Sequence, residues 1–316
     1  MLSEKKETEL QDALAVYVHW PFCESKCPYC DFNSHVRDHV DAAAYGRAYL
    51  RELARFKALT GPASCSSIFF GGGTPSLMPP ALVAGIIEAV RNLWPSALEP
   101  EVSLEANPSS VEAGRFQAYR QAGVNRLSLG VQSLEDQALK RLGRLHDAAQ
   151  SRKAMTTALE IFERVNFDLI YARPGPHGPE APGDWSRELG EVLSFGAGHL
   201  SLYQLTIEPG TAFHTAFRKG ELPMPGEDAS LALFDLTREL TEKAGLKAYE
   251  VSNHARDGEP CRHNLDIWRG GAYIGVGPGA HGRFQMEGSD LWTACQQPRT
   301  PENWLRAATE DDGSAT

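Results

Sequence analysis

The sequence predicts an α/β fold in which parallel strands alternate with helices around a barrel. Six strand-like runs are each followed by a helix-like run, and strands separated by a helix pair in parallel. Glycine or polar residues end several of these runs, at the edge where parallel barrels carry their active sites. A chain of 316 residues is long enough to form one such domain.

Each predicted strand is a short apolar run. The six runs are residues 15–20, 67–70, 101–105, 126–130, 167–171 and 200–207, and residues 247–251 are a candidate seventh. Apolar residues recur at helical spacing between the runs, as in Tyr45, Tyr49, Leu53 and Phe56, in Met155, Leu159 and Phe162, and in Leu233, Leu236 and Leu240. We expect an irregular proline-rich loop at 173–184, a glycine-rich segment at 270–282 and a frayed end over the last dozen residues.

Composition and charge exclude several classes of protein. Hydrophobic residues make up 42% and charged residues 23%, as in soluble globular proteins, and no apolar run is long enough to span a bilayer. A net charge of -10 argues against a nucleic-acid partner, which requires clustered lysine and arginine. The first residues lack the apolar core of a secretory signal, so we expect a cytoplasmic location.

Three of the six cysteines, Cys23, Cys27 and Cys30, lie in one loop directly after the first predicted strand. Their spacing suits three corners of a 4Fe-4S cube, which normally takes four thiolates, so one iron would stay open to another ligand. Clustering in a chain without a secretory signal indicates metal ligation rather than disulfides. A zinc site completed by His19 or His35 is the alternative.

The cysteine motif and five other strings resemble a known family. CxxxCxxC after a first strand, with Tyr29 before the third cysteine, is similar to the motif of the radical S-adenosylmethionine superfamily. The strings IFFGGGTPSLM, SLEANPSSVE, GVNRLSLGVQSLEDQALKRLGRLH, LYQLTIEPGT and EVSNHARDGEPCRHNLDIW resemble the oxygen-independent coproporphyrinogen III oxidase group, above all its HemW-type heme chaperone branch. The match runs from about residue 16 to about residue 284.

The resemblance implies a fold, cofactors and site residues. The fold is a partial (β/α)6 barrel of the TIM type at residues 15–245, with a tail at 1–14 and a small C-terminal extension at 246–316 that is truncated relative to the family. The cofactors are a 4Fe-4S cluster on the three cysteines and S-adenosylmethionine bound at the open iron. The residues that match the family's cofactor pocket are Tyr17, Tyr29, Gly72, Gly73, Thr74, Glu105, Gln132, Arg144, Asp168 and Thr206.

The chemistry of these residue types agrees with the resemblance. Glycines at 71–73 would let the amine and carboxylate of an amino acid approach the open iron, although a tight turn is the alternative. Glu105 and Asp168 can accept hydrogen bonds from ribose hydroxyls or an amine, and Gln132 and Arg144 can reach carboxylate and sugar oxygens. Taken alone, each of these four residues could equally be a structural or surface polar group with no role in binding. Catalysis on this scaffold would begin with reductive cleavage of S-adenosylmethionine to a radical.

Two departures from the oxidase favour the chaperone branch. Phe32 stands where the oxidase has a further cysteine, and only sixteen residues precede Tyr17, whereas the oxidase has a longer segment there. The chaperone branch also carries an HNxxYW string associated with heme binding, and residues 263–268 read HNLDIW. The resemblance therefore implies that the protein binds heme and delivers it to acceptor proteins, such as those of respiratory chains.

His263 is the candidate heme ligand. A neutral imidazole is a good axial ligand for heme iron, and the aromatic Trp268 can pack against a porphyrin. Ile267 replaces the family's tyrosine, Cys261 is a competing soft ligand, and a hydrogen-bonded structural histidine is the alternative.

Two further departures concern the cavity. Arg173 and its proline-rich neighbours replace the family's GLPGQ string and would place a cation beside the cavity mouth. Relatives also continue past the point where this chain ends. Besides the chaperone, two functions stay open: an enzyme acting on a porphyrin, such as an oxygen-independent coproporphyrinogen III dehydrogenase, and a non-radical metal-binding scaffold.

Overall fold

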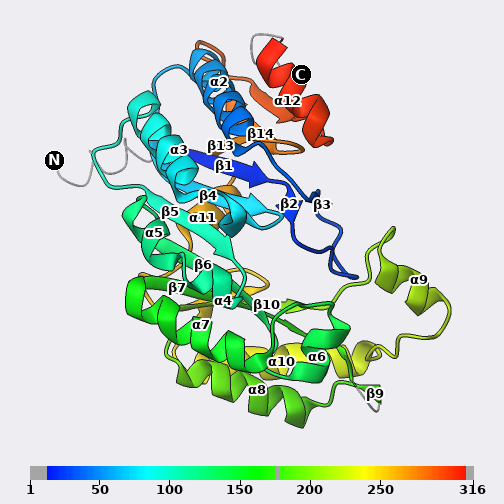
Figure 1. Cartoon of the computed structure of the whole chain (residues 1–316). Coiled ribbons are helices and arrows are strands. Elements are labelled where there is room, and N and C mark those ends of the chain that lie inside the picture. The colour runs from blue at the N-terminus through cyan, green and yellow to red at the C-terminus, as the bar shows by residue number, and fades with distance from the viewer. Residues whose placement is uncertain (1–12, 176–177, 311–316) are drawn as a thin grey trace.

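One curved sheet of eleven strands organises the residues that this computed structural model describes, 13–175 and 178–310 (Figure 1). Along the sheet lie β11 (Lys247–Ala248), β12 (Asn253–Ala255), β10 (His199–Gln204), β7 (Arg164–Tyr171), β6 (Arg126–Gln132), β5 (Glu101–Ala106), β4 (Ser64–Gly72), β1 (Ala13–Trp20), β13 (Ala272–Val276), β14 (His281–Gln285) and β15 (Trp292–Gln296). The strands from β10 to β13 in this order pair in parallel. The outer pairs are antiparallel.

The predicted α/β fold with a partial barrel of parallel strands is confirmed. All six predicted strands are present, although the sixth, β10, ends at Gln204 instead of residue 207. The candidate seventh strand at 247–251 is wrong, because only the two residues of β11 form a strand there and they pair antiparallel to β12. The parallel strand beyond the six is β13, which pairs with β1 and lies inside the segment expected to be a glycine-rich loop.

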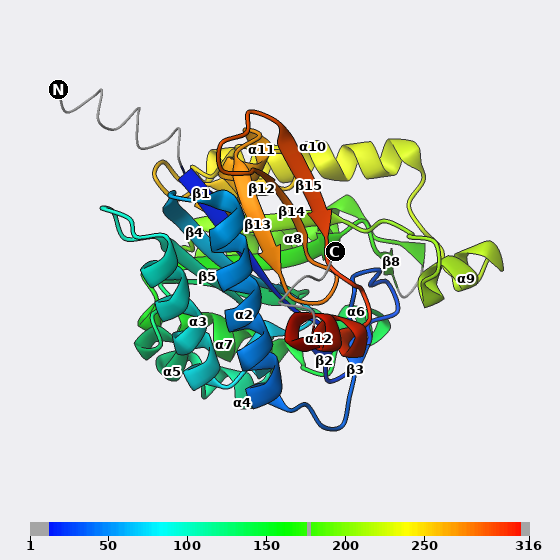
Figure 2. The same ribbon diagram turned by 90° about the horizontal axis from the view of Figure 1, so that it is seen from above.

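Most helices cover the outside of the curved sheet (Figures 1 and 2), whereas the helix at Arg262–Trp268 lies on its inner side, where it contributes to the wall of a cavity. The helices are α2 (Ala42–Thr60), α3 (Pro80–Leu93), α4 (Ser110–Ala113), α5 (Phe116–Gln121), α6 (Asp136–Arg141), α7 (Ala148–Ile161), α8 (Pro182–Ser194), α9 (Ala212–Arg218), α10 (Glu227–Lys243), α11 (Arg262–Trp268) and α12 (Pro301–Glu310), with a 3-10 turn η1 (Pro75–Leu77). The predicted helical spacings fall on α2, α7 and α10. Asp147 begins α7 with a reciprocal capping box to Gln150.

Alternation along the central strands separates an apolar core from a polar barrel interior. On β6, Leu127 and Leu129 belong to the hydrophobic core, whereas Arg126 and Ser128 line a cavity. The same alternation on β7 places Phe167 and Leu169 in the core and Asn166 and Asp168 on the cavity. A TIM-type barrel normally fills its interior with branched apolar side chains. Polar residues at these positions leave room for a ligand instead.

The proline-rich segment at 173–184 is not wholly irregular. Short strands β8 (Pro174–Gly175) and β9 (Gly178–Pro179) pair antiparallel, and α8 begins at Pro182, whereas residues 176–177 lie outside the described part. Arg173 is buried and forms ion pairs with Glu180 and Glu188. Arg173 does not line the cavity, and its charge is balanced by these carboxylates, so the expectation that it places a cation beside the cavity mouth is not supported.

The C-terminal residues are more ordered than expected. Residues 301–310 form α12, whose Trp304 is buried and donates through Nε1 to Glu52 of α2 at 3.0 Å. The expectation of a frayed end is thus wrong for residues up to 310, and residues 311–316 lie outside the described part. At the other end β1 begins at Ala13, and residues 1–12 of the predicted tail are not described. The division at 245 stays a prediction, because β11 to β15 all join the same sheet.

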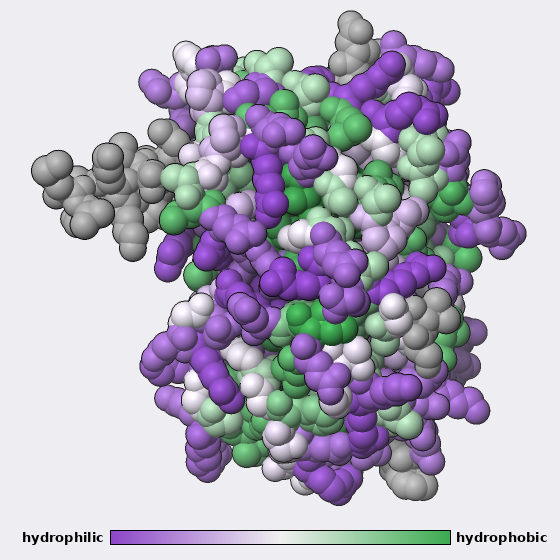
Figure 3. Space-filling model, turned by 60° about the vertical axis from the view of Figure 1, so that its left-hand side comes forward, coloured by the Kyte–Doolittle hydropathy of each residue, from purple (hydrophilic) through white to green (hydrophobic). Residues whose placement is uncertain are grey.

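No helix in the described ranges is both long and apolar enough to cross a bilayer. Figure 3 shows a face on which hydrophilic residues predominate and hydrophobic residues form small separate groups.

Candidate cofactor and ligand site

A cavity of about 580 Å³ lies inside the barrel. Its walls come from β1, β4, β5, β6, β7, β10, β13, β14 and β15, from the loop after β1, from α11 and from the segments next to β14 and β15. Of the predicted site residues, five line it: Tyr17, Gly72, Glu105, Asp168 and His263. The volume is within the range of small-molecule sites, about 300–1,000 Å³.

The three cysteines occupy the loop from β2 (Phe22–Cys23) to β3 (His35–Val36), at the carboxyl end of β1. Their thiols are free and half-buried, and two receive hydrogen-bond donors at 3.4 Å: Thr74 Oγ1 on Cys23 Sγ, and Arg144 Nη1 on Cys27 Sγ. Burial raises the pKa of Cys23 and of Cys30. Donors aimed at sulfur stabilise thiolates that hold a metal centre, so this loop fits the predicted cluster.

The zinc alternative fits less well. Within residues 13–175 and 178–310, no three His, Cys, Asp or Glu side chains converge as ligands of one ion. Both ring nitrogens of His19 are occupied, Nδ1 by Tyr17 Oη at 3.0 Å and Nε2 by the Asn33 carbonyl at 2.9 Å, while His35 Nε2 lies 3.3 Å from Asn33 Oδ1. A zinc ion needs four ligands around one centre. The three thiolates that hold a 4Fe-4S cluster each bind a different iron atom, so they lie further apart than ligands of a single ion.

The glycines at the end of β4 are required by the protein's own packing. A Cβ on Gly71 would come within 2.8 Å of the Tyr17 ring, and one on Gly73 within 2.8 Å of the Phe22 carbonyl oxygen. Gly72 has a φ of +115°, which side chains other than glycine rarely adopt. Packing within the protein is therefore enough to explain all three glycines, and the approach of an amino acid along them stays a prediction, although Gly72 does line the cavity.

Two carboxylic acids line the cavity and lie close enough for their charges to interact. Glu105 Oε2 accepts from the Gly72 amide at 3.2 Å, and burial, followed by the charge of Asp168, raises the pKa of Glu105 to about 8. Asp168 accepts from Ser128 Oγ at 3.0 Å and from Asn166 Nδ2 at 2.8 Å, while burial raises its pKa. Glu105 is thus largely protonated near neutral pH and would ionise when a cationic group, such as an amine, binds beside it.

The other predicted residues do not line the cavity: the three cysteines, Tyr29, Gly73, Thr74, Gln132, Arg144 and Thr206. Arg144 contacts the cysteine loop and donates to the Gly130 carbonyl at 3.2 Å. Tyr29 lies in that loop, and burial raises its pKa. Gln132 ends β6 with a φ of +64°, and Thr206 is exposed after the end of β10. Arg144 and Tyr29 therefore surround the sulfurs, whereas the cofactor roles of Gln132 and Thr206 stay predictions.

His263 projects from α11 into the barrel. Its Nδ1 lies 3.2 Å from Ser67 Oγ, and its ring stacks on Phe69 and Tyr17 with centroid distances of 5.1 and 6.1 Å. Among the described residues, Nε2 of His263 has no hydrogen-bond partner. Burial lowers the pKa of His263 to about 3, so the ring is neutral at physiological pH. A neutral imidazole with one free nitrogen on a cavity is suited to metal ligation.

The neighbours of His263 do not share its environment. Trp268 is 61% exposed and does not line the cavity, so the expected packing of Trp268 on a porphyrin held by His263 is not supported, whereas Ile267 does line the cavity. Cys261 is buried, its Sγ lies 3.4 Å from Glu101 Oε1, and burial raises its pKa to about 11. A thiol that keeps its proton is a poor ligand, which disfavours Cys261 as the competitor.

Sequence reasoning missed several cavity residues. Arg126 could have been found from the alternation of polar and apolar residues along its strand. Asn33 joins the cysteine loop to the C-terminal segment, because its Nδ2 donates to the carbonyls of Pro278 and Arg299 at 2.9 Å each. Tyr273, His281 and Gln296 also line the cavity. Sequence reasoning could not place them, because the strands that carry them, β13, β14 and β15, were not predicted.

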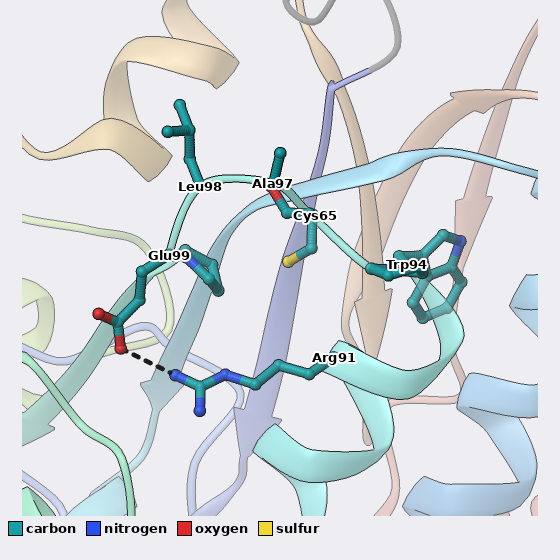
Figure 4. A pocket seen from close by; sticks show the side chains of 9 residues that line it. Cys65, Arg91, Trp94, Ala97, Leu98 and Glu99 are labelled. Atoms are coloured by element: carbon teal, nitrogen blue, oxygen red, sulfur yellow. Dashed lines mark hydrogen bonds and ion pairs between the residues drawn. The ribbon is translucent and has the colours of Figure 1, made fainter.

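A second cavity, of about 330 Å³, lies at the amino end of β4 (Figure 4). Cys65, Trp94 and the ion pair between Arg91 and Glu99, at 3.2 Å, line it. Burial raises the pKa of Cys65 to about 12, so its thiol is unreactive. This cavity begins at the opposite end of β4 from Gly72 and the cysteine loop.

Known proteins share both sequence and fold with this chain. The family model for the "Radical SAM superfamily" matches residues 17–177. The bovine "Radical S-adenosyl methionine domain-containing protein 1, mitochondrial" is 42% identical over 295 residues, which are 92% of this chain and 66% of that protein. "Heme chaperone HemW" of Escherichia coli is 42% identical over 274 residues, or 85% of this chain and 70% of that protein.

Among solved structures, coproporphyrinogen III oxidase (HemN) from Escherichia coli, described as a radical SAM enzyme, superposes with a TM-score of 0.78. The alignment covers 96% of this chain and 71% of that one, and at 23% identity it shows a shared fold. This chain spans slightly less than two thirds of the bovine and mouse relatives, 66% of each. These matches confirm the family predicted from the cysteine motif: the chain belongs to the radical SAM superfamily, in the family that includes the HemW proteins.

Proposed function

We propose that this protein is a heme chaperone, which holds a 4Fe-4S cluster on Cys23, Cys27 and Cys30, binds S-adenosylmethionine and heme, and delivers heme to acceptor proteins. The observation that carries the proposal is the continuity of one cavity. Asn33 of the cysteine loop and His263 of α11 line the same space inside the barrel. A cofactor held at the cysteine loop and a heme held at His263 would therefore be neighbours at one cavity.

The residues around the cysteine loop suit the two cofactors. Thr74 and Arg144 direct donors at the sulfurs, and Glu105 and Asp168 offer carboxylates to an amine or to ribose hydroxyls on the adjoining wall. When bound, the cluster and S-adenosylmethionine together supply one-electron chemistry. The protein's part is to orient the cofactor and to exclude water from it.

His263 suits heme as cargo. Phe69 and Tyr17 stack on the imidazole and hold its orientation. Ser67 contacts Nδ1, so Nε2 is the nitrogen that would bind the heme iron. Because burial keeps the imidazole neutral, the free nitrogen is available without loss of a proton.

The chaperone is preferred to an enzyme acting on a porphyrin for two reasons. Relatives at 38–42% identity include several named heme chaperone HemW, whereas the likeness to the oxidase concerns the fold. Phe32, which stands where the oxidase has a cysteine, lines the cavity. Acceptor proteins in respiratory chains and a cytoplasmic location stay predictions, and relatives named as mitochondrial exist.

The cluster is tested on anaerobically purified full-length chain that is reconstituted with ferrous iron and sulfide. We expect close to four irons and four sulfides per chain, and an EPR signal of the reduced cluster that changes when S-adenosylmethionine is added. The variants Cys23→Ser, Cys27→Ser and Cys30→Ser should lose this signal. Cys295→Ser, half-buried on β15, is the matched control and should keep it. Zinc without iron or sulfide would contradict the proposal.

Heme binding and transfer are tested separately. Hemin should bind one to one, with an absorption band of imidazole-ligated iron that His263→Ala removes and that His39→Ala, at an exposed loop position, leaves intact. The loaded protein should then pass heme to an apo-heme protein. Conversion of coproporphyrinogen III to protoporphyrinogen under anaerobic conditions, without heme transfer, would instead establish the alternative enzyme.

A further inference from the structure

Arg126 is a buried cation that no described residue pairs with. It is 2% exposed, it points into the barrel from the start of β6, and it lines the cavity. In the described part of the chain its guanidinium makes no hydrogen bond and no ion pair. A guanidinium carries five N–H donors, and leaving them unpaired in the interior is costly. Such a group indicates a site for an anion.

The nearby carboxylates are engaged elsewhere. Glu101 pairs with Arg164 Nη1 at 2.6 Å and accepts from the Arg262 amide at 2.8 Å. Asp168 accepts from Ser128 and Asn166. Burial lowers the pKa of Arg126, but Cys261, followed by Glu101, Tyr249 and Asp168, acts on it through space and raises the pKa above its ordinary value. Neither carboxylate reaches hydrogen-bonding distance. The donors of Arg126 are therefore available to a ligand in the cavity.

The position of Arg126 favours one source for the anion. Arg126 starts β6, at the amino end of the parallel strands, whereas the cysteine loop follows the carboxyl end of β1. The carboxylate of an amino-acid cofactor bound at a cluster iron lies at the cysteine end. A tetrapyrrole carries carboxylates on its rim, away from its central metal, so one ligand could reach both Arg126 and His263, which line the same cavity.

We propose that Arg126 binds a carboxylate of the ligand in the cavity, and that this carboxylate is a propionate of heme. The planar fork of a guanidinium matches a carboxylate with two parallel hydrogen bonds. The assignment rests on the proposed function, because it takes heme as the cargo. Arg126 then sets the orientation of the porphyrin and selects against uncharged analogues.

The test compares hemin with hemin dimethyl ester, in which both propionates are esterified, and measures S-adenosylmethionine in parallel. Titrations followed by absorption use the full-length wild type, Arg126→Met, Arg126→Lys and Arg91→Met. Loss of a charge-assisted pair should weaken hemin binding to Arg126→Met about tenfold or more, with an intermediate loss in Arg126→Lys. The ester should bind wild type and Arg126→Met alike. Arg91→Met, the matched control, removes a cation of α3 that pairs with the exposed Glu99 and does not line this cavity, and should bind hemin like wild type.

Each other outcome overturns a stated part of the proposal. If Arg126→Met weakens S-adenosylmethionine binding and leaves hemin binding unchanged, the carboxylate site stands but belongs to the cofactor, and the propionate assignment is wrong. If neither ligand is affected, the carboxylate site itself is wrong. If Arg126→Met fails to fold, equal affinity of wild type for hemin and its diester overturns the proposal. Absence of hemin binding to wild type would instead refute the proposed function.

Discussion

Glu52 is expected to make the stability of the protein fall as the pH rises. Its carboxyl is fully buried on α2, where it accepts from the Gly277 amide at 2.7 Å and from Trp304 Nε1 at 3.0 Å. These contacts join α2 to the loop after β13 and to α12. Burial nevertheless dominates and raises the pKa of Glu52 from 4.5 to about 8. The folded state therefore holds a proton that the unfolded state releases between these two pH values.

The size of the effect follows from the two pKa values. A shift from 4.5 to about 8, at about 1.36 kcal/mol per unit, lowers the free energy of unfolding by about 5 kcal/mol between pH 4.5 and pH 8. Glu52→Gln removes the ionisation but replaces one acceptor oxygen with an amide group beside Trp304, at a cost of about 1 kcal/mol. The variant should thus be about 1 kcal/mol less stable than wild type at pH 4.5 and about 4 kcal/mol more stable at pH 8.5.

Urea unfolding of the metal-free protein, followed by circular dichroism at pH 4.5, 5.5, 7 and 8.5, measures this difference. The two stabilities should cross between about pH 5 and pH 6. Glu242→Gln, at an exposed position of α10, is the control and should stay within about 0.5 kcal/mol of wild type throughout. A difference between Glu52→Gln and wild type that is the same at every pH would refute the reasoning.

Three further substitutions test the packing around the site by urea unfolding. Asn33→Ala removes two hydrogen bonds to carbonyls of the C-terminal segment and should cost about 1–3 kcal/mol; an unchanged midpoint would show that the contacts contribute nothing. Gly73→Ala places a Cβ within 2.8–2.9 Å of three backbone atoms and should destabilise by about 1–3 kcal/mol and lower the iron bound on reconstitution, whereas Gly85→Ala, with open space around it, should do neither. Thr237→Val leaves buried Trp185 Nε1 without its acceptor at 2.8 Å and should cost about 1–3 kcal/mol; a neutral effect would contradict this.

The strands of the barrel were predictable because each is a short apolar run followed by a helical pattern. The prediction failed where glycines interrupt the run. β13 includes Gly275, whose Cβ would lie 2.1 Å from the His281 carbonyl oxygen, so close packing against β14 demands glycine there. Because glycine is a typical loop residue, this segment was not predicted as a strand, and only the contact with His281 explains why glycine is needed there. The pairing of β1 with β13 was not predicted for the same reason.

The site was predictable where residue type and strand position agree. Glu105, near the end of β5, does line the cavity, and so does Asp168, although it lies in the middle of β7 and not at its end as expected. Thr206 was placed by motif alone and is exposed, because β10 ends two residues earlier. Arg173 was expected beside the cavity mouth, but it is buried in ion pairs with Glu180 and Glu188, and it does not line the cavity. Both partners lie on the same side of it in the sequence, but only the fold shows that the chain turns back to bring them to Arg173.

The pairing of β1 with β13 has a consequence for biosynthesis. Leu14 pairs with Ala272, so one side of the first strand has no partner until the ribosome has translated β13. The cysteines that follow this strand emerge long before β13. During this interval the free edge of β1 is exposed, and an unpaired edge is a template for aggregation. Pairing with β13 thus removes an edge that the protein leaves open through most of its synthesis.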